Sequence, residues 1–170
     1  MPAQLTAVIG VRACDLAALA LQDQHFLSEY QRDAAYAARR QQLILIAVNC
    51  THPSASCFCH STGDGPQASS GYDLLLDELD DGFALRSGSA TGEQIVQQLE
   101  LEALQSRQLG EIDNAHRQAI EHQSRHLPDA NLEQVLNTLQ ESGQWQDVAE
   151  RCLSCGNCTA VCPSCFCHSQ

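Results

Sequence analysis

Apolar residues near the amino terminus form two short runs separated by a helical pattern. Residues 5–11 predict a buried strand, and the almost continuous apolar run 43–49 is typical of a strand covered on both faces of a parallel sheet. Between them, apolar positions at helical spacing predict helices over about 15–30, capped by Asp15, and over 33–41. Strand, helix and strand in this order indicate a right-handed α/β crossover.

The pattern changes after the second strand. Residues 50–71 form a long loop rich in Cys, Ser, Gly, Pro and Thr, and loops of that length in compact domains are usually functional or disordered. Strand-like residues 72–79 and 83–87 flank an Asp-Asp-Gly turn, which predicts a β-hairpin. Four helices are expected after the hairpin, at residues 91–99, 101–126, 130–141 and 144–151. The long segment 101–126 has only a thin apolar stripe, so we expect a solvated helix that packs by one face.

The composition excludes several classes of function. The net charge is −12 and all nine basic residues are Arg, which makes nucleic acid a poor partner because its binding starts from phosphate neutralisation. No apolar stretch reaches the roughly 18 residues of a membrane span, and residues 1–20 do not resemble a signal peptide. We therefore expect a cytoplasmic protein, in which ten cysteines indicate metal binding or catalysis rather than disulfides.

Four of the cysteines form one closely spaced run: Cys152, Cys155, Cys158 and Cys162, followed by Pro163. The spacing C-x2-C-x2-C-x3-C-P is that of bacterial ferredoxin-type proteins, and a tight turn there can direct the first three thiolates at a 4Fe-4S cluster. In two-cluster ferredoxins the fourth cysteine of one run ligates the other cluster, so such runs come in pairs, and this chain has one. The alternatives are a zinc knot or a disulfide-rich tail.

A second group of cysteines lies near the predicted strand ends: Cys14, Cys50, Cys57 and Cys59. Ligands collect outside the carboxyl ends of the strands in α/β sheets, so these four could hold another cluster. Equally, Cys14 and Cys50 could be small buried hydrophobic residues. The hexapeptide Ser-Cys-Phe-Cys-His-Ser occurs twice, at 56–61 and 164–169, and its second copy adds Cys165 and Cys167 as possible ligands.

The predicted fold is therefore α/β. It has a small, mainly parallel sheet with crossover helices and a β-hairpin, followed by a helical segment that leads into a truncated ferredoxin-like 4Fe-4S module. We expect an α/β domain at 1–90 that includes the Cys-rich loop 50–71, a helical segment at 91–151, and the first half of a ferredoxin-type domain at 152–170.

Several motifs together resemble a known family. They are Gly10–Leu16, Val48–Cys50, Cys57–Cys59 leading into Gly63–Pro66, Cys152–Cys158, and Cys162–Cys167. In this order they resemble the 4Fe-4S dicluster subunits of cytosolic complexes, namely the beta subunit of NAD(P)-linked nickel–iron hydrogenase (sulfhydrogenase) and the corresponding iron–sulfur subunit of anaerobic sulfite reductase.

The resemblance implies an electron-transfer subunit without an active site of its own. It would relay electrons between a flavin- and NAD(P)H-binding partner and a catalytic hydrogenase or sulfite reductase subunit. The family carries a second cysteine run that would supply the fourth ligand to Cys152, Cys155 and Cys158, so we expect this chain to be a fragment. The alternatives are a zinc-stabilised interaction module, or a thiol-based redox protein that uses Cys57/Cys59 or Cys165/Cys167.

Overall fold

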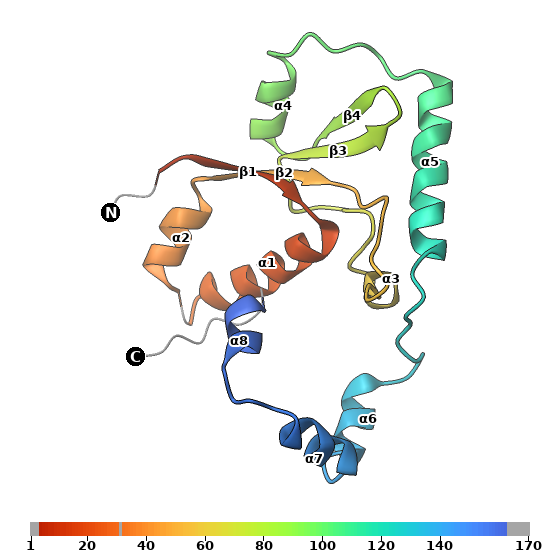
Figure 1. Ribbon diagram of the computed structural model, residues 1–170. Helices are drawn as coiled ribbons and strands as arrows, with labels where there is room; N and C mark the ends of the chain where they lie inside the picture. The colour runs from red at the N-terminus through yellow and green to blue at the C-terminus, as the bar shows by residue number, and fades with distance from the viewer. Residues whose placement is uncertain (1–3, 31, 163–170) are drawn as a thin grey trace. The chain divides into compact units, whose positions relative to one another are not determined.

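The computed structural model describes residues 4–30 and 32–162, which fall into two compact units with a boundary between residues 126 and 127. The first unit contains a four-stranded sheet with helices, and the described part of the second is helical (Figure 1). The α/β fold class is confirmed. The finer division at 90/91 and 151/152 stays a prediction.

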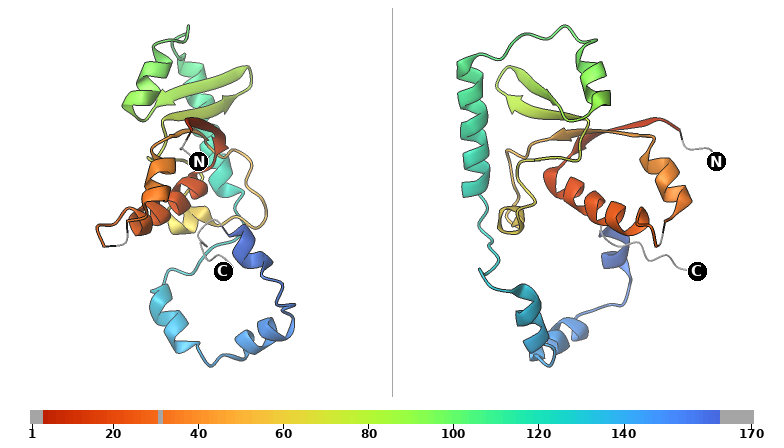
Figure 2. Two further views of the ribbon diagram at one scale, coloured as in Figure 1. Left: turned by 90° about the vertical axis from the view of Figure 1, so that its left-hand side faces the viewer. Right: turned by 180° about the vertical axis from the view of Figure 1, so that it is seen from behind.

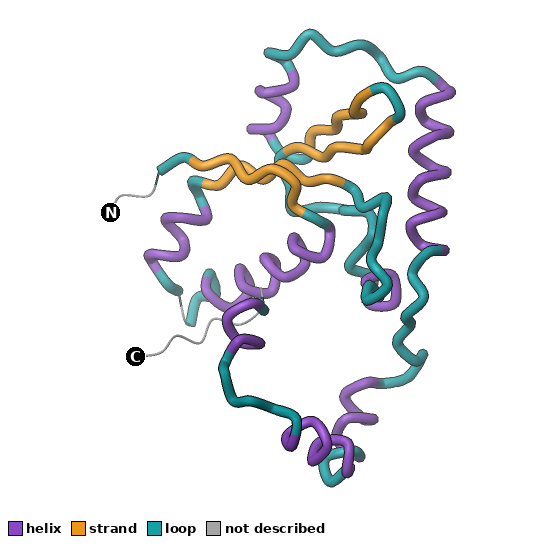
Figure 3. Tube along the Cα trace, in the orientation of Figure 1, coloured by secondary structure: helices purple, strands orange, loops and turns teal. Residues whose placement is uncertain are grey.

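All strands of the described residues lie in the first unit (Figure 3). In chain order the elements are β1 (Thr6–Val11), α1 (Ala13–Phe26), α2 (Ala34–Arg40), β2 (Leu43–Val48), α3 (Cys59–Thr62), β3 (Leu74–Leu79), β4 (Gly82–Ser87), α4 (Ala90–Val96), α5 (Ser106–Glu121), α6 (Leu132–Thr138), α7 (Gly143–Glu150) and α8 (Asn157–Val161).

The strands follow one another across the sheet in the order β1-β2-β3-β4. β1 pairs parallel with β2 and β2 parallel with β3, whereas β3 and β4 form the predicted antiparallel hairpin with Leu79 opposite Gly82. β1 is an edge strand of the described sheet, and Ile9 on it is 71% exposed. The register shifts between Ile9 and Val11, where Gly10 has a φ of +87°, so the end of β1 is bent where the chain enters α1.

The core of the first unit lies on the two central strands. Leu45 and Ala47 of β2 and Leu75 of β3 are almost completely buried, and Leu16 of α1 packs on them. The loop between β2 and β3 lies between the start of α1 and the end of α5 (Figures 1 and 2). These contacts bring three distant segments of the chain to the carboxyl ends of β1 and β2.

Several helices differ from their predicted bounds. α1 starts two residues earlier than expected, with Arg12 at the N-cap, and Asp15 stabilises this start from inside the helix by accepting a hydrogen bond from the Arg12 N–H (3.0 Å). α5 is shorter than the predicted 101–126. Gln105 caps its start, and the helix ends at Glu121 with His122 as its C-cap, beyond which the Gln123 side chain bonds to the loop between β2 and β3. α3 is a short helix inside the loop that the sequence pattern did not predict.

Two short helices of the second unit, α6 and α7, have side-chain caps. Asn131 accepts a hydrogen bond from the Gln134 N–H (3.1 Å) at the start of α6, and Ser142 caps α7. Trp145 donates from its indole nitrogen to the Leu139 carbonyl (2.6 Å), which joins α7 to the end of α6. Within the described ranges, no helix has both the length and the apolar character that a membrane crossing requires.

Candidate functional site

Two of the candidate cysteines lie directly after neighbouring parallel strands. Cys14 is in the first turn of α1, just beyond β1, and Cys50 is two residues beyond β2. The Cys50 N–H donates to the Pro66 carbonyl (3.1 Å), which returns the loop to this edge of the sheet. Because parallel strands end at the same edge, the two cysteines are placed where α/β proteins bind their ligands.

The loop brings two further cysteines to the same region. The Cys57 N–H donates to the Ser54 carbonyl (3.0 Å), and Cys59 opens α3. A Cβ atom added at Gly65 would lie 3.0 Å from Cys59 Sγ and 3.3 Å from the Cβ of Ala13. The Cys59 sulfur therefore lies close to the start of α1, and the absence of a side chain at Gly65 permits this approach.

The thiol of Cys59 lies within electrostatic reach of the other three thiols. Burial raises the pKa of Cys14 above its ordinary value, and the nearby Asp15 and Cys59 raise it further. Burial also raises the pKa of Cys59, with further contributions from Cys57 and Cys50. Thiolates gathered in this way repel one another, and a bound metal centre supplies the positive charge that holds them deprotonated. The donor set therefore suits a thiolate-ligated cluster.

The grouping is looser than a single ion requires. Among the described residues, no three His, Cys, Asp or Glu side chains are placed to hold one metal ion. Cys14, Cys50, Cys57 and Cys59 are not in disulfides. A cubane cluster presents its iron atoms at separate corners, so its thiolate ligands surround a larger volume than the ligands of one ion. The structure leaves the ligand role of these four cysteines as a prediction.

The cysteine run in the second unit is a turn followed by a short helix. Gly156 has a φ of +71° at the start of α8, and Ser154 has a φ of +52°. The Ser154 N–H donates to Cys152 Sγ (3.4 Å), so the turn already directs a backbone donor at a sulfur atom. Cys155 and Cys158 are exposed on this turn. Cys162 forms the C-cap of α8, whereas Pro163, Cys165 and Cys167 lie outside the described residues.

A buried polar network, which the sequence reasoning missed, fixes the loop against the strand ends. Asn49 donates to Asp77 Oδ1 (2.7 Å) and accepts from the Ala68 N–H (2.8 Å). His116 of α5 bonds to the same carboxylate oxygen, and Gln67 of the loop bonds to the other ring nitrogen of His116. The only signal in the sequence is the position of Asn49, a polar residue directly after a buried strand.

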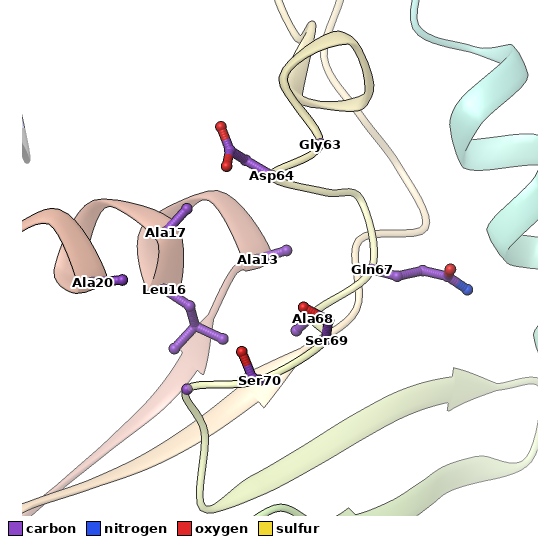
Figure 4. Close-up of a pocket in the computed structure, with 11 residues that line it drawn as sticks. Ala13, Leu16, Ala17, Ala20, Gly63, Asp64, Gln67, Ala68, Ser69 and Ser70 are labelled. Carbon is purple, nitrogen blue, oxygen red and sulfur yellow. The ribbon is translucent and has the colours of Figure 1, made fainter.

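The loop also borders a cavity of about 190 Å³ beside α1 (Figure 4). Small side chains line most of it, and none of the four cysteines does. Figure 4 shows Gln67 pointing away from α1, in agreement with its bond to His116. The cavity and the cysteine group are therefore separate features of the same loop.

The comparisons with known proteins agree with the interpretation of the cysteine run as a 4Fe-4S motif. Residues 112–166 match the family of 4Fe-4S dicluster domains. The match begins inside α5, in the first unit, and continues through the cysteine run.

A longer similarity covers nearly the whole chain. Over 163 residues the chain is 31% identical to sulfhydrogenase 2 subunit beta of Pyrococcus furiosus, an alignment that covers 95% of this chain and 48% of that protein. The chain thus spans about half the length of this relative. The resemblance to 4Fe-4S dicluster subunits is confirmed by both findings. No solved structure matches the chain.

Proposed function

We propose that this chain is an iron–sulfur electron-transfer subunit. It relays electrons between a flavin- and NAD(P)H-binding partner and the catalytic subunit of a hydrogenase or sulfite reductase. The observation that carries the proposal is the run Cys152–Cys162 within the match to 4Fe-4S dicluster domains. The similarity to a sulfhydrogenase subunit supports the assignment to a multisubunit complex.

The cysteine run lies at a bend of the backbone that suits the binding of a cluster. Left-handed conformations at Ser154 and Gly156 turn the chain between Cys152 and Cys158. The N–H of Ser154 stabilises the Cys152 sulfur, as hydrogen bonds to ligand sulfurs do in iron–sulfur proteins. Cys162 follows α8 and is the fourth cysteine of the run, for this cluster or a neighbouring one. Bound clusters supply one-electron transfer, so no catalytic residue is required here.

The group at Cys14, Cys50, Cys57 and Cys59 is a second proposed cluster site. Its support is the position at the carboxyl ends of β1 and β2 and the mutual influence of the thiols. Asp15 adds negative charge beside Cys14, and the whole chain carries −12. Negative charge disfavours the reduced state of a cluster, so these groups lower its reduction potential.

The raised pKa values argue against a thiol-based redox enzyme at this group. The nucleophile in thiol–disulfide exchange is the thiolate, and reactive cysteines usually have a lowered pKa. Burial and the neighbouring thiols raise the pKa of Cys59 instead, so its free thiol is a weak nucleophile. Because clustered free thiols persist in a reducing compartment, we place the protein in the cytoplasm.

Metal analysis of anaerobically prepared protein tests the proposal. We expect iron and acid-labile sulfide in similar amounts, and a low-temperature EPR signal after reduction. Cys155→Ser lowers the iron content, whereas Thr159→Ser, a control at an exposed position of α8, does not. Tightly bound zinc without sulfide would instead establish the zinc-stabilised module and refute electron transfer.

The partners are tested by coexpression with the products of the neighbouring genes. We expect a complex that transfers electrons from NAD(P)H through this chain, and a Cys155→Ser complex that assembles but transfers them more slowly. The catalytic partner's cofactor, nickel–iron or sirohaem, then distinguishes a hydrogenase from a sulfite reductase. A complex with neither cofactor would refute this assignment.

A further inference from the structure

One buried side chain reaches the second cysteine group from a distant part of the chain. Gln123 is 2% exposed and lies just beyond α5, separated by 64 residues from Cys59 in sequence. Its side-chain nitrogen lies 3.4 Å from Cys59 Sγ, and its side-chain oxygen accepts from the His60 N–H (3.1 Å). Burying an amide group this deeply costs free energy unless its nitrogen and its oxygen both have hydrogen-bond partners.

The orientation of this amide follows from its neighbours. A backbone N–H can only donate, so the His60 N–H requires the oxygen of Gln123 on its side. The NH2 group is then turned toward the sulfur of Cys59. A neutral Cys59 thiol can donate back to the oxygen, which is 3.7 Å away, but a thiolate can only accept, so the N–H···S bond is the one that persists when Cys59 ligates metal.

Contacts of α5 with the sheet fix the position from which the Gln123 side chain extends toward Cys59. Ile112, His116 and Ala119 form its buried face, and His116 bonds to Asp77 of β3 at 2.7 Å. The Gln123 N–H donates to the Ile120 carbonyl (3.1 Å), so the backbone at Gln123 is fixed to the last turn of the helix. The sulfur of Cys59 therefore has a donor that is held by the sheet through α5.

We infer that Gln123 is a positioning residue that orients Cys59 and raises the reduction potential of a cluster bound there by donating a hydrogen bond to its sulfur. The inference rests on the proposed cluster site at Cys14, Cys50, Cys57 and Cys59. Reduction adds negative charge to the cluster and its sulfur ligands, and a hydrogen-bond donor stabilises that charge. Gln123 thereby opposes the lowering of the potential by Asp15 and the neighbouring thiolates.

The test is a redox titration of the reconstituted full chain, followed by EPR. The signal that disappears in Cys59→Ser identifies the cluster concerned. In Gln123→Leu we expect the ratio of reduced to oxidised cluster at a fixed solution potential to fall about tenfold, equivalent to about 59 mV for one electron. Gln118→Leu, the same change on the exposed face of α5, leaves the ratio unchanged.

A second variant covers the case in which Gln123→Leu does not fold. Gln123→Glu keeps an oxygen for the His60 N–H and replaces only the donor to sulfur, so we expect the ratio to fall at least as far. An unshifted potential in both folded variants, with iron lost in Cys59→Ser, refutes the role of Gln123 alone. An unchanged iron content in Cys59→Ser refutes the second cluster site and this inference together.

Discussion

His116 and Asp77 form a buried hydrogen bond, with His116 Nε2 lying 2.7 Å from Asp77 Oδ1. The two residues are 8% and 4% exposed, and the bond joins α5 to β3. Asp77 also accepts from Asn49, and Gln67 bonds to the second ring nitrogen of His116. One carboxylate thus connects the end of β2, the hairpin and α5, the helix after which Gln123 follows.

Removing this carboxylate should destabilise the first unit. Asp77→Ala leaves Asn49 and His116 without their common acceptor, and each unpaired buried polar group costs about 1–3 kcal/mol. Urea unfolding should show a lower free energy of unfolding. Asp113→Ala, on the exposed side of α5, is the matched control and should change it little. Equal stability of the two variants would contradict a structural role of the network.

Replacement of Gly92 and of Gly110 by Ala should change the stability of the first unit in opposite directions. A Cβ atom at Gly92 would lie 1.8 Å from the Asp73 carbonyl oxygen, so Gly92→Ala forces α4 away from the sheet and lowers the melting temperature. Gly110 inside α5 has open space around it, and Gly110→Ala should stabilise the chain by about 0.5–1 kcal/mol. Thermal unfolding followed by circular dichroism measures both, and a stabilising Gly92→Ala would refute the close packing of α4.

The turn in the cysteine run depends on a left-handed residue. Gly156→Ala should raise the free energy of the turn by about 1–2 kcal/mol, because a φ of +71° is unfavourable for a residue with a side chain. We expect iron to be retained roughly tenfold less well against a chelator. Gly143→Ala, at a position in α7 without a positive φ, serves as the control. Equal iron retention in the two variants would show that the cluster does not require this turn.

Tyr36 should ionise at unusually high pH. Burial, followed by the hydrogen bond to Asp23 (2.7 Å) and the charge of Asp23, raises the pKa of Tyr36 from 10.0 to about 12. The folded pKa of Tyr36 exceeds the unfolded one, so its protonated hydroxyl contributes to the free energy of unfolding. This contribution is complete below pH 10 and is lost as the pH rises through 12. An absorbance titration should show a late ionisation step that disappears in Tyr36→Phe and persists in Tyr30→Phe. A late step in Tyr36→Phe would refute its assignment.

The features encoded by short-range patterns were predictable. β2 begins at Leu43 as expected from its apolar run, in which Leu45 and Ala47 are buried and the other residues are half-buried. The cysteine spacing predicts a tight turn, and Gly156 between Cys155 and Cys158 has a φ of +71°. The family resemblance rested on the same local motifs and is confirmed by the comparisons.

Features that depend on distant contacts were not predictable. Residues 122–126 continue the polar helical pattern of α5, yet Gln123 leaves the helix region to bond with Cys59 and His60. α3 is a single turn, too short for a periodic signal, and it forms against segments that are remote in sequence. Asp77 looked like an ordinary polar position of a hairpin strand, and only the fold brings His116 to it.

The exposed edge at β1 has a consequence for handling the protein. Leu5, Val8 and Ile9 present apolar side chains beside backbone groups that face no strand in the described sheet, which is a template for pairing between molecules. The charge of −12 keeps such molecules apart at low ionic strength. Added salt screens that repulsion while leaving the apolar edge intact, so concentrated buffers should promote precipitation where dilute ones keep the chain dispersed.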